Sequence, residues 1–197
     1  LEKGLIKLCA EQIFEGEPDA HDGYVASGGT EANIEALWIY RNYFIQHYHA
    51  EINQIGVIYS EDSHYSISKG INLLNLQSIL VSVDKQSREL IIPDMEKKID
   101  QALAKGINYF IINVNLSTTM FGSVDDIDNI TNVLSTRQLT FKLHVDAAFG
   151  GFIYPFSNPG GSFTFKNPHI SSFTIDGHKM LQTPYGTGSF LIPKGLM

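Results

Sequence analysis

The sequence has a single cysteine, Cys9, among 197 residues, so no disulfide can form within the chain. Basic residues are also scarce, because 14 Lys and Arg against 21 Asp and Glu give a net charge of −7, which disfavours binding to nucleic-acid phosphates. No uninterrupted apolar run approaches the roughly 20 residues of a membrane-spanning helix. Residues 1–10 lack the basic region and long apolar stretch of a signal peptide. We therefore expect a cytoplasmic protein without a nucleic-acid or membrane partner.

What is present is typical of a packed globular chain: 43% hydrophobic residues, 17 Gly and only 7 Pro. A chain of this length buries roughly 70% of the surface that its unfolded form exposes. The sequence begins at Leu1 within an apparent amphipathic helix, whose apolar positions are Leu5, Ile6, Leu8, Cys9 and Ile13, and it stops shortly after a predicted strand. We therefore expect a fragment of a longer protein.

Short β-rich runs alternate with longer segments of helical period, the pattern of a parallel sheet with crossover helices. Strands are predicted at residues 56–60, 79–83, 109–114, 141–145, 171–175 and 188–192, and helices at 30–49, 66–74, 94–105 and 125–134. Segment 149–168 contains three prolines and a Gly-Gly pair and is predicted to be a loop. The sequence thus predicts one α/β domain.

Three segments carry residues suited to chemistry. In the first, Gly28, Gly29 and Thr30 precede a predicted helix. Free backbone N–H groups, a hydroxyl and the positive end of the helix dipole together suit a phosphate group. The alternative is a glycine turn in which Thr30 is an ordinary N-cap.

The second segment ends a buried strand with Asp146, followed by Ala147 and Ala148. Ligands of doubly wound sheets bind beyond the carboxyl ends of the strands, and small side chains leave room for a flat group. A turn or capping role for Asp146 is the alternative.

In the third segment, Lys179 follows another apolar strand. Its apolar neighbours Met180 and Leu181 would favour an uncharged, nucleophilic amine, although a lone lysine is more often a solvated surface residue.

Together these segments supply what pyridoxal 5'-phosphate needs. The glycine cradle would anchor the phosphate, Asp146 would keep the pyridine nitrogen protonated, and Lys179 would hold the aldehyde as a Schiff base. His64 follows a further predicted strand and could stack on the ring.

Four segments, GYVASGGTEAN, SEDSHYS, HVDAAFGGF and TIDGHKM, occur in this order over most of the chain. The set closely resembles the group II pyridoxal-phosphate-dependent amino acid decarboxylases. The resemblance implies the type I, aspartate aminotransferase-like fold, whose large cofactor-binding domain is a three-layer α/β sandwich with a mainly parallel sheet. It also implies decarboxylation of a small-molecule L-amino acid to an amine and CO2, a homodimer, and a missing N-terminal segment and C-terminal small domain outside residues 1–197.

The resemblance also assigns roles to individual residues. It implies that Gly28, Gly29 and Thr30 contact the phosphate, that Lys179 forms the Schiff base, and that Asp146 pairs with the ring nitrogen. The remaining implied cofactor contacts are His64 and Ala148 on the two ring faces, Thr118 and Thr119 in a loop near the cofactor, and Asp176 and His178 at the phosphate or the substrate.

The sequence departs from the family pattern at three positions. Ser117 stands where many members have Gly, Gly177 replaces a frequent Pro, and Asp176 stands where a number of relatives have Asn. A carboxylate at position 176 would repel a phosphate unless it faced away. The three arginines lie outside the motif segments, so the group that reads the substrate is not identified.

Alternative functions remain at this point. Another enzyme of the same fold and cofactor, such as a carbon-carbon lyase or an aminotransferase, would use the same ring-binding residues, and a noncatalytic fragment would keep them without turnover. Ser27, Asp146 and His178 occur in the chain order of an α/β-hydrolase triad, but Val25 breaks its G-x-S-x-G pattern. No metal site is predicted, since His47 and His49 do not share a helix face.

Overall fold

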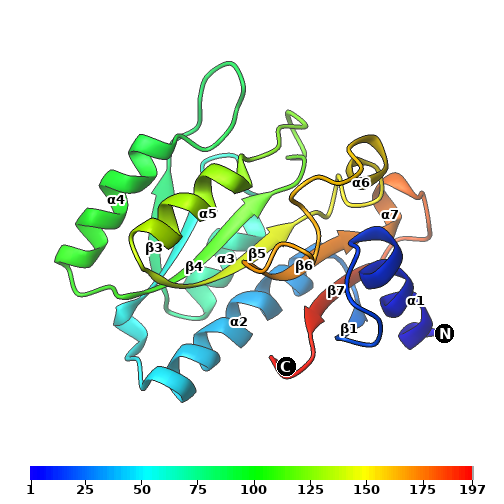
Figure 1. The fold of residues 1–197 in the computed structure, drawn as a ribbon, viewed down its shortest axis with the longest axis horizontal. Coiled ribbons are helices and arrows are strands. Elements are labelled where there is room, and N and C mark those ends of the chain that lie inside the picture. Colours follow the sequence, from blue (N-terminus) through cyan, green and yellow to red (C-terminus); the bar gives the residue numbers. More distant parts are fainter. Residues whose placement is uncertain (197) are drawn as a thin grey trace.

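The computed structural model describes residues 1–196, drawn in Figure 1. Its helical segments are α1 (Glu2–Leu8), a π-helical turn (Cys9–Ile13), α2 (Gly29–Tyr48), a 3₁₀ turn (Ile52–Gln54), α3 (Tyr65–Leu73), α4 (Ile92–Ala104), α5 (Ile127–Thr136), α6 (Tyr154–Ser157) and α7 (Gly177–Met180). Its strands are β1 (His21–Ala26), β2 (Ile55–Ser60), β3 (Gln77–Val81), β4 (Tyr109–Asn115), β5 (Thr140–Asp146), β6 (Ile170–Asp176) and β7 (Gly188–Pro193). Within residues 1–196, no helix is both long and apolar enough to cross a membrane.

The described strands form one sheet in the order β1-β7-β6-β5-β4-β2-β3. Strands β3, β2, β4, β5 and β6 run parallel, and β7 lies antiparallel between β6 and β1. The carboxyl ends of β1, β2, β4, β5 and β6 therefore lie at the same edge of the sheet. Ligands of such sheets bind beyond this edge.

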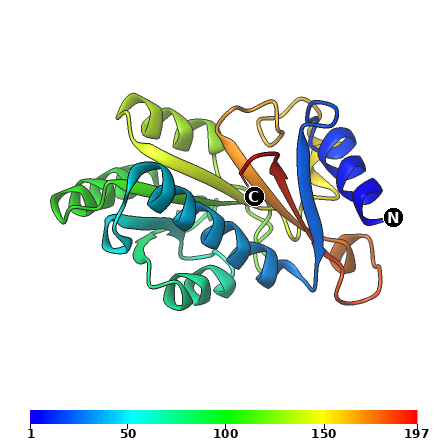
Figure 2. The same cartoon turned by 90° about the horizontal axis from the view of Figure 1, so that it is seen from below.

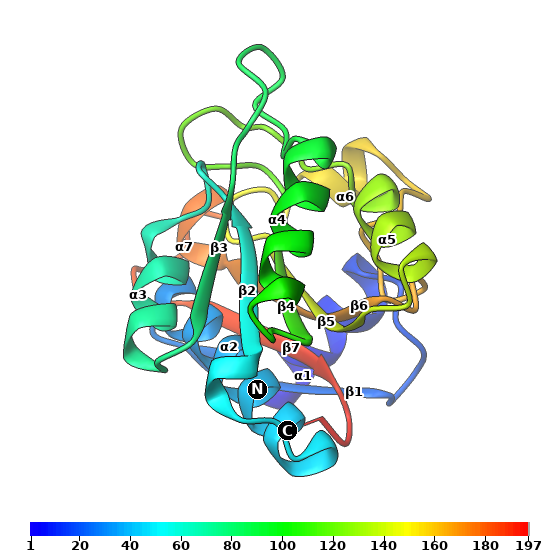
Figure 3. The same cartoon turned by 90° about the vertical axis from the view of Figure 1, so that its left-hand side faces the viewer.

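Helices cover both faces of the sheet, as Figures 2 and 3 show from two further sides. In β4, Phe110 and Ile112 pack into the core beneath α4 and α5, whereas Ile111 packs into a second core beneath α2 and α3. This alternation follows from the two-residue period of a strand. The two apolar cores make the molecule a three-layer α/β sandwich, which confirms the predicted fold class.

The six predicted strands and four predicted helices all occur, with boundaries within two residues of the prediction. Strand β1 was not predicted, because its sequence HDGYVA carries polar residues and a glycine in place of an apolar run. The predicted loop 149–168 holds only the short α6. Of the apolar positions in the N-terminal helical segment, Ile6, Cys9 and Ile13 are buried, whereas Leu5 and Leu8 are exposed.

The N-terminal helical segment packs on the sheet through Phe14. The Phe14 ring stacks on Phe173 of β6, with 4.0 Å between ring centroids and 20° between ring planes. Both side chains are fully buried, and Phe165 meets Phe14 edge-on at 6.5 Å. This aromatic cluster fixes residues 1–14 against the side of the sheet that also carries α4 and α5.

We expect Phe14→Ala to lower the free energy of unfolding by about 3–5 kcal/mol, because it leaves a cavity against Phe173. Urea denaturation followed by circular dichroism measures this change. The matched control is Leu5→Ala in the same segment, at a side chain that is 43% exposed, and we expect a change of about 0.5 kcal/mol or less. Equal effects of the two substitutions would show that the N-terminal segment does not pack as described.

Candidate active site

A cavity of about 510 Å³ lies at the carboxyl edge of the parallel strands. It is lined by all eleven predicted site residues: Gly28, Gly29, Thr30, His64, Thr118, Thr119, Asp146, Ala148, Asp176, His178 and Lys179. Nine further residues line it: Ser27, Glu31, Asn33, Asp62, Tyr65, Asn115, Ser117, Phe149 and Tyr185. The fold thus brings together residues up to 158 positions apart in the sequence, from Ser27 to Tyr185.

Helix α2 begins at the cavity, at Gly29, directly after strand β1. Its N-cap Gly28 has no side chain to accept a hydrogen bond, so the first N–H groups of the helix are left without a side-chain cap. A Cβ atom at Gly29 would lie 2.9 Å from Asp176 Oδ2 and 3.2 Å from the Cβ of Ala148, so glycine permits the close approach. Thr30 lies inside the first turn and is not the N-cap, which corrects that alternative.

Asp146 ends strand β5 and is almost fully buried. Its Oδ2 accepts a hydrogen bond from the Asn33 amide at 2.8 Å, and its Oδ1 accepts one from the Ala148 backbone N–H at 3.1 Å. Both donors are uncharged. No Lys, Arg or His of residues 1–196 forms an ion pair with Asp146, so its charge is left for a group in the cavity.

Lys179 lies in the short α7 that follows β6, with its Nζ 3.2 Å from Asp176 Oδ2. The prediction that Lys179 lies among apolar side chains is wrong. Met180 and Leu181 are exposed, and the Lys179 amine has the Asp176 carboxylate as its partner. Asp176 does not face away from the glycine cradle either: it packs beneath Gly29, and Lys179 balances its charge. The buried Asp176 Oδ1 has no hydrogen-bond partner among residues 1–196.

The geometry excludes the serine hydrolase alternative. Ser27 Oγ donates to Glu31 Oε2 at 2.6 Å. His178 Nδ1 accepts from the Thr187 N–H at 3.4 Å, and its Nε2 lies 3.7 Å from Asp176. No hydrogen bond joins Ser27, His178 and Asp146 in the described part of the chain, so they form no triad.

His64 is the N-cap of α3 and lies in the loop after β2. Its Nδ1 is 2.8 Å from Ser66 Oγ and also accepts the Ser66 N–H at 3.3 Å. Burial lowers the pKa of His64 below its usual value, which favours the neutral form of the ring. A neutral, flat imidazole is therefore presented at the cavity wall.

The two backbone departures from the family pattern have structural explanations. Ser117 adopts a left-handed conformation with φ of 75°, which glycine adopts without strain. Gly177 donates its backbone N–H to the Thr187 carbonyl at 2.8 Å, a bond that proline could not make. In the same loop as Ser117, Thr118 is held by Ser123, with 2.8 Å between the two hydroxyl oxygens.

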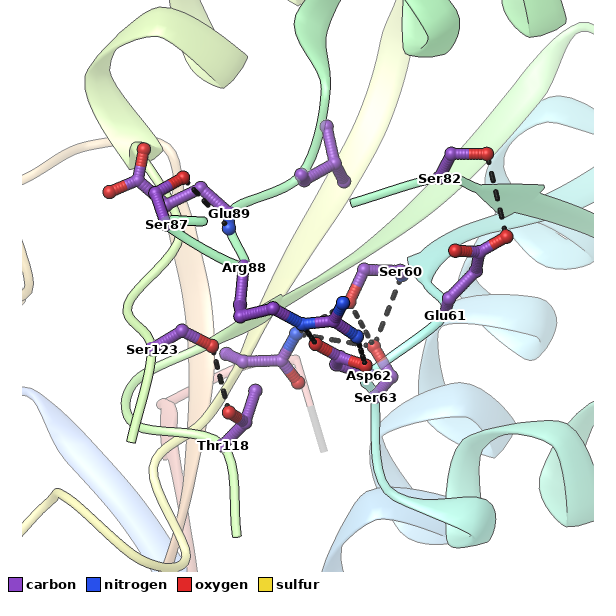
Figure 4. A network of polar contacts seen from close by, with 12 residues as sticks. Ser60, Glu61, Asp62, Ser63, Ser82, Ser87, Arg88, Glu89, Thr118 and Ser123 are labelled. Atoms are coloured by element: carbon purple, nitrogen blue, oxygen red, sulfur yellow. Dashed lines mark hydrogen bonds and ion pairs between the residues drawn. The ribbon is translucent and has the colours of Figure 1, made fainter. Parts of the chain in front are cut away.

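Sequence reasoning missed an ion pair at the mouth of the cavity, which Figure 4 shows. The Arg88 guanidinium donates two hydrogen bonds to Asp62, from Nε to Oδ2 at 2.8 Å and from Nη2 to Oδ1 at 2.6 Å. Phe121 lies against the other side, with the guanidinium carbon 4.4 Å from the ring centroid. Arg88 thus joins three loops of the cavity edge: 82–91, 61–64 and 117–123.

Comparison with known proteins identifies the family. The model of the pyridoxal-dependent decarboxylase conserved domain matches residues 3–194. The chain belongs to this family. It is 48% identical over 197 residues to the tryptophan decarboxylase of Clostridium sporogenes, covering 100% of this chain and 47% of that enzyme. It is 35% identical over 183 residues to the histidine decarboxylase of Solanum lycopersicum, covering 90% of this chain and 41% of that enzyme.

A solved structure shows the same fold. The glutamate decarboxylase of Lactobacillus brevis superposes with a TM-score of 0.84 at 19% identity, covering 100% of this chain and 45% of that one. The chain spans about half the length of the curated relatives that it matches. The resemblance inferred from the four sequence segments is confirmed.

The donor set of the cavity fits pyridoxal 5'-phosphate, the cofactor of this family. Asp146 is a buried carboxylate without a cationic partner in the described chain, which suits a protonated ring nitrogen. The uncapped start of α2 offers N–H groups to a phosphate, and Gly29 keeps this surface free of a side chain. Lys179 lines the same cavity and supplies the primary amine that an aldehyde-binding lysine needs.

We expect Arg88→Ala to loosen the loop of residues 82–91, because Arg88 has a left-handed backbone conformation with φ of 62° that its contacts to Asp62 and Phe121 hold in place. Hydrogen exchange of peptides from this loop, followed by mass spectrometry, should become several-fold faster.

The control for this experiment is Lys85→Ala, at an exposed side chain of the same loop. We expect it to leave the exchange rate unchanged. Asp62→Asn should reproduce the effect of Arg88→Ala, and unchanged exchange in both would contradict a role for the ion pair in holding the loop.

Proposed function

We propose that this chain is the cofactor-binding large domain of an amino acid decarboxylase, which uses pyridoxal 5'-phosphate to convert an L-amino acid into the corresponding amine and CO2. The observation that carries the proposal is the convergence of Lys179, Asp146, His64 and the start of α2 on one cavity. Membership of the decarboxylase family and 48% identity to a tryptophan decarboxylase support it.

In this proposal each residue has a distinct binding task. Lys179 Nζ holds the cofactor aldehyde, Asp146 pairs with the ring nitrogen, and Gly28, Gly29 and Thr30 bind the phosphate. The flat sides of the ring are contacted by His64 and Ala148, and Thr118, Thr119, Asp176 and His178 border the cofactor and the substrate.

The reaction breaks the bond between Cα and the carboxylate carbon of the substrate. CO2 leaves, the electron pair stays at Cα, and a proton added there gives the amine. The bound cofactor supplies the electron-accepting ring system that stabilises this electron pair. Asp146 contributes by holding positive charge at the ring nitrogen, an interaction preorganised by its bonds to Asn33 and Ala148.

An aromatic L-amino acid is the first substrate candidate, because the tryptophan decarboxylase matches the whole of this chain at 48% identity. Aromatic side chains at the cavity, Tyr65, Phe149 and the 92% exposed Tyr185, are compatible with this choice. We further propose that the protein acts as a cytoplasmic homodimer. The single cysteine supports a reducing compartment.

The cofactor role predicts that added pyridoxal 5'-phosphate colours the protein yellow and that borohydride reduction traps it on Lys179. Absorption spectra and peptide mass mapping measure both effects. Lys179→Ala should lose the trapped adduct, and the matched control Lys194→Ala, at an exposed lysine, should retain it. Absence of label on the Lys179 peptide of the unmodified protein would contradict the assignment of this lysine.

Decarboxylation predicts equal amounts of CO2 and amine from one member of a panel of L-amino acids that begins with tryptophan, tyrosine, histidine and serine. Radiometric CO2 capture and chromatography of the amine measure the two products. Lys179→Ala should abolish both, because the substrate then has no covalently held cofactor to react with. A keto acid or an aldehyde in place of the amine would assign a different reaction to the same site.

A further inference from the structure

A series of hydrogen bonds joins helix α2 to two side chains that line the cavity, Asp146 and His64. Asn33 is at its centre and is 1% exposed. Its amide nitrogen lies 2.8 Å from Asp146 Oδ2 and 2.9 Å from Ser66 Oγ. Its amide oxygen lies 3.0 Å from Nε2 of the buried His144. Neither the sequence segments nor the family resemblance assigned Asn33 a role.

The hydrogen-bond partners determine which way each proton points. A carboxylate only accepts hydrogen bonds, so the amide nitrogen of Asn33 faces Asp146 and its oxygen faces His144. His144 must then donate from Nε2. Burial lowers the pKa of His144 to about 3, so its ring is neutral and Nδ1 accepts a hydrogen bond.

The hydrogen bonds on the other side of His144 are donated in the same direction, toward Asp146. His144 Nδ1 lies 2.6 Å from Ser172 Oγ, and the Tyr40 hydroxyl donates to the same oxygen. Ser172 therefore accepts from Tyr40 and donates to His144. Thr174 Oγ1, 3.2 Å from His144 Nε2, is the remaining neighbour of the ring nitrogens. In the series Tyr40, Ser172, His144, Asn33 and Asp146, each residue thus donates a hydrogen bond to the next, and the Asp146 carboxylate is the final acceptor.

A branch from Asn33 reaches His64. Ser66 Oγ accepts the second amide hydrogen of Asn33 and lies 2.8 Å from His64 Nδ1, to which it donates. The Ser66 backbone N–H donates to the same nitrogen at 3.3 Å. With Nδ1 accepting, the proton of the neutral His64 ring is on Nε2.

We propose that Asn33 is a positioning residue that orients the Asp146 carboxylate and, through the Ser66 hydroxyl, strengthens the hydrogen bonding that keeps Nδ1 of His64 an acceptor. One side chain of α2 thereby couples the partner of the ring nitrogen to the imidazole at the ring face. The effect of Asn33 on the cofactor and the reaction rests on the proposed function. The coupling between the two residues is a property of the protein without its cofactor.

The test compares Asn33→Ser, whose hydroxyl is too short to reach Asp146 and Ser66, with Ser66→Ala, which cuts only the branch to His64. Asn42→Ser is the matched control, since Asn42 lies on the same helix and, among residues 1–196, its side chain hydrogen-bonds only to Arg41. Nitrogen-15 spectra of the histidine rings in the cofactor-free protein report the tautomer. His64→Gln identifies the His64 signals.

In the unmodified protein we expect one protonated and one unprotonated His64 nitrogen, with well separated signals. The Nδ1 signal should shift in Asn33→Ser and Ser66→Ala, where its bond to the Ser66 hydroxyl is weakened or lost, and stay in place in Asn42→Ser. The charged groups around His64, which are Asp146 on β5, Asp176 and Lys179 near the end of β6, and Lys69 on α3, are retained in every variant. Unchanged His64 signals in both variants would overturn the coupling.

Cofactor binding tests separately whether Asn33 orients Asp146. Titration with pyridoxal 5'-phosphate, followed by absorbance, should show about 10- to 100-fold weaker binding for Asn33→Ser, since a hydrogen bond to a charged group is lost. Ser66→Ala leaves the bond between Asn33 and Asp146 and should bind more tightly than Asn33→Ser. Equal affinity of Asn33→Ser and Asn42→Ser for pyridoxal 5'-phosphate would overturn the role of Asn33 at Asp146. If the unmodified protein takes up no cofactor, the proposed function fails, and the His64 signals still decide the coupling.

Discussion

The alternation of side chains between the two faces of a strand determines where polarity lies in this molecule. On β4, β5 and β6, the positions that face α4 and α5 remain apolar up to the end of each strand. The positions that face α2 become polar in the second half of the strands: Asn113, Asn115, His144, Asp146, Ser172, Thr174 and Asp176. A buried polar layer therefore lies on the face that α2 and α3 cover, and at the carboxyl edge of the sheet this layer becomes the wall of the cavity.

Buried polar groups require partners, and α2 is built to supply them. Asn33 and Tyr40 are seven residues apart and so lie on the same side of the helix, among apolar residues such as Leu37 and Phe44. Glycine at position 29 lets the start of the helix approach Asp176 and Ala148. The same helix thus provides both an uncapped N-terminus at the cavity and the hydrogen bonds that hold Asp146.

Six of the seven described strands and the candidate residues Gly28, Gly29, Thr30, His64, Asp146 and Lys179 could be predicted from local signals: apolar runs, glycines before a helix, and polar residues just after a strand. The other candidate site residues came from the family resemblance. The roles of Asn33 and Ser66 could not be predicted, since they depend on which side chains meet across the core, 113 residues apart for Asn33 and Asp146. A polar residue at every second position of an apolar strand, as in His144 and Asp146, was an available signal for the buried layer. Arg88 gave no such signal, because its ion pair depends on how a loop folds back onto Asp62.

Three buried carboxylates lie at this edge of the sheet. Their partners distinguish a carboxylate that holds the fold together from one that is available to a ligand. Asp125 accepts bonds from the Asn115 N–H and amide and from the Leu90 N–H, and burial still raises its pKa. These donors place Asp125 between β4 and the segment before α4, as a structural group. Asp176 has the ammonium of Lys179 as its partner. Asp146 has two neutral donors and no ionic partner among residues 1–196, which supports the proposal that it pairs with a positively charged ring nitrogen bound in the cavity.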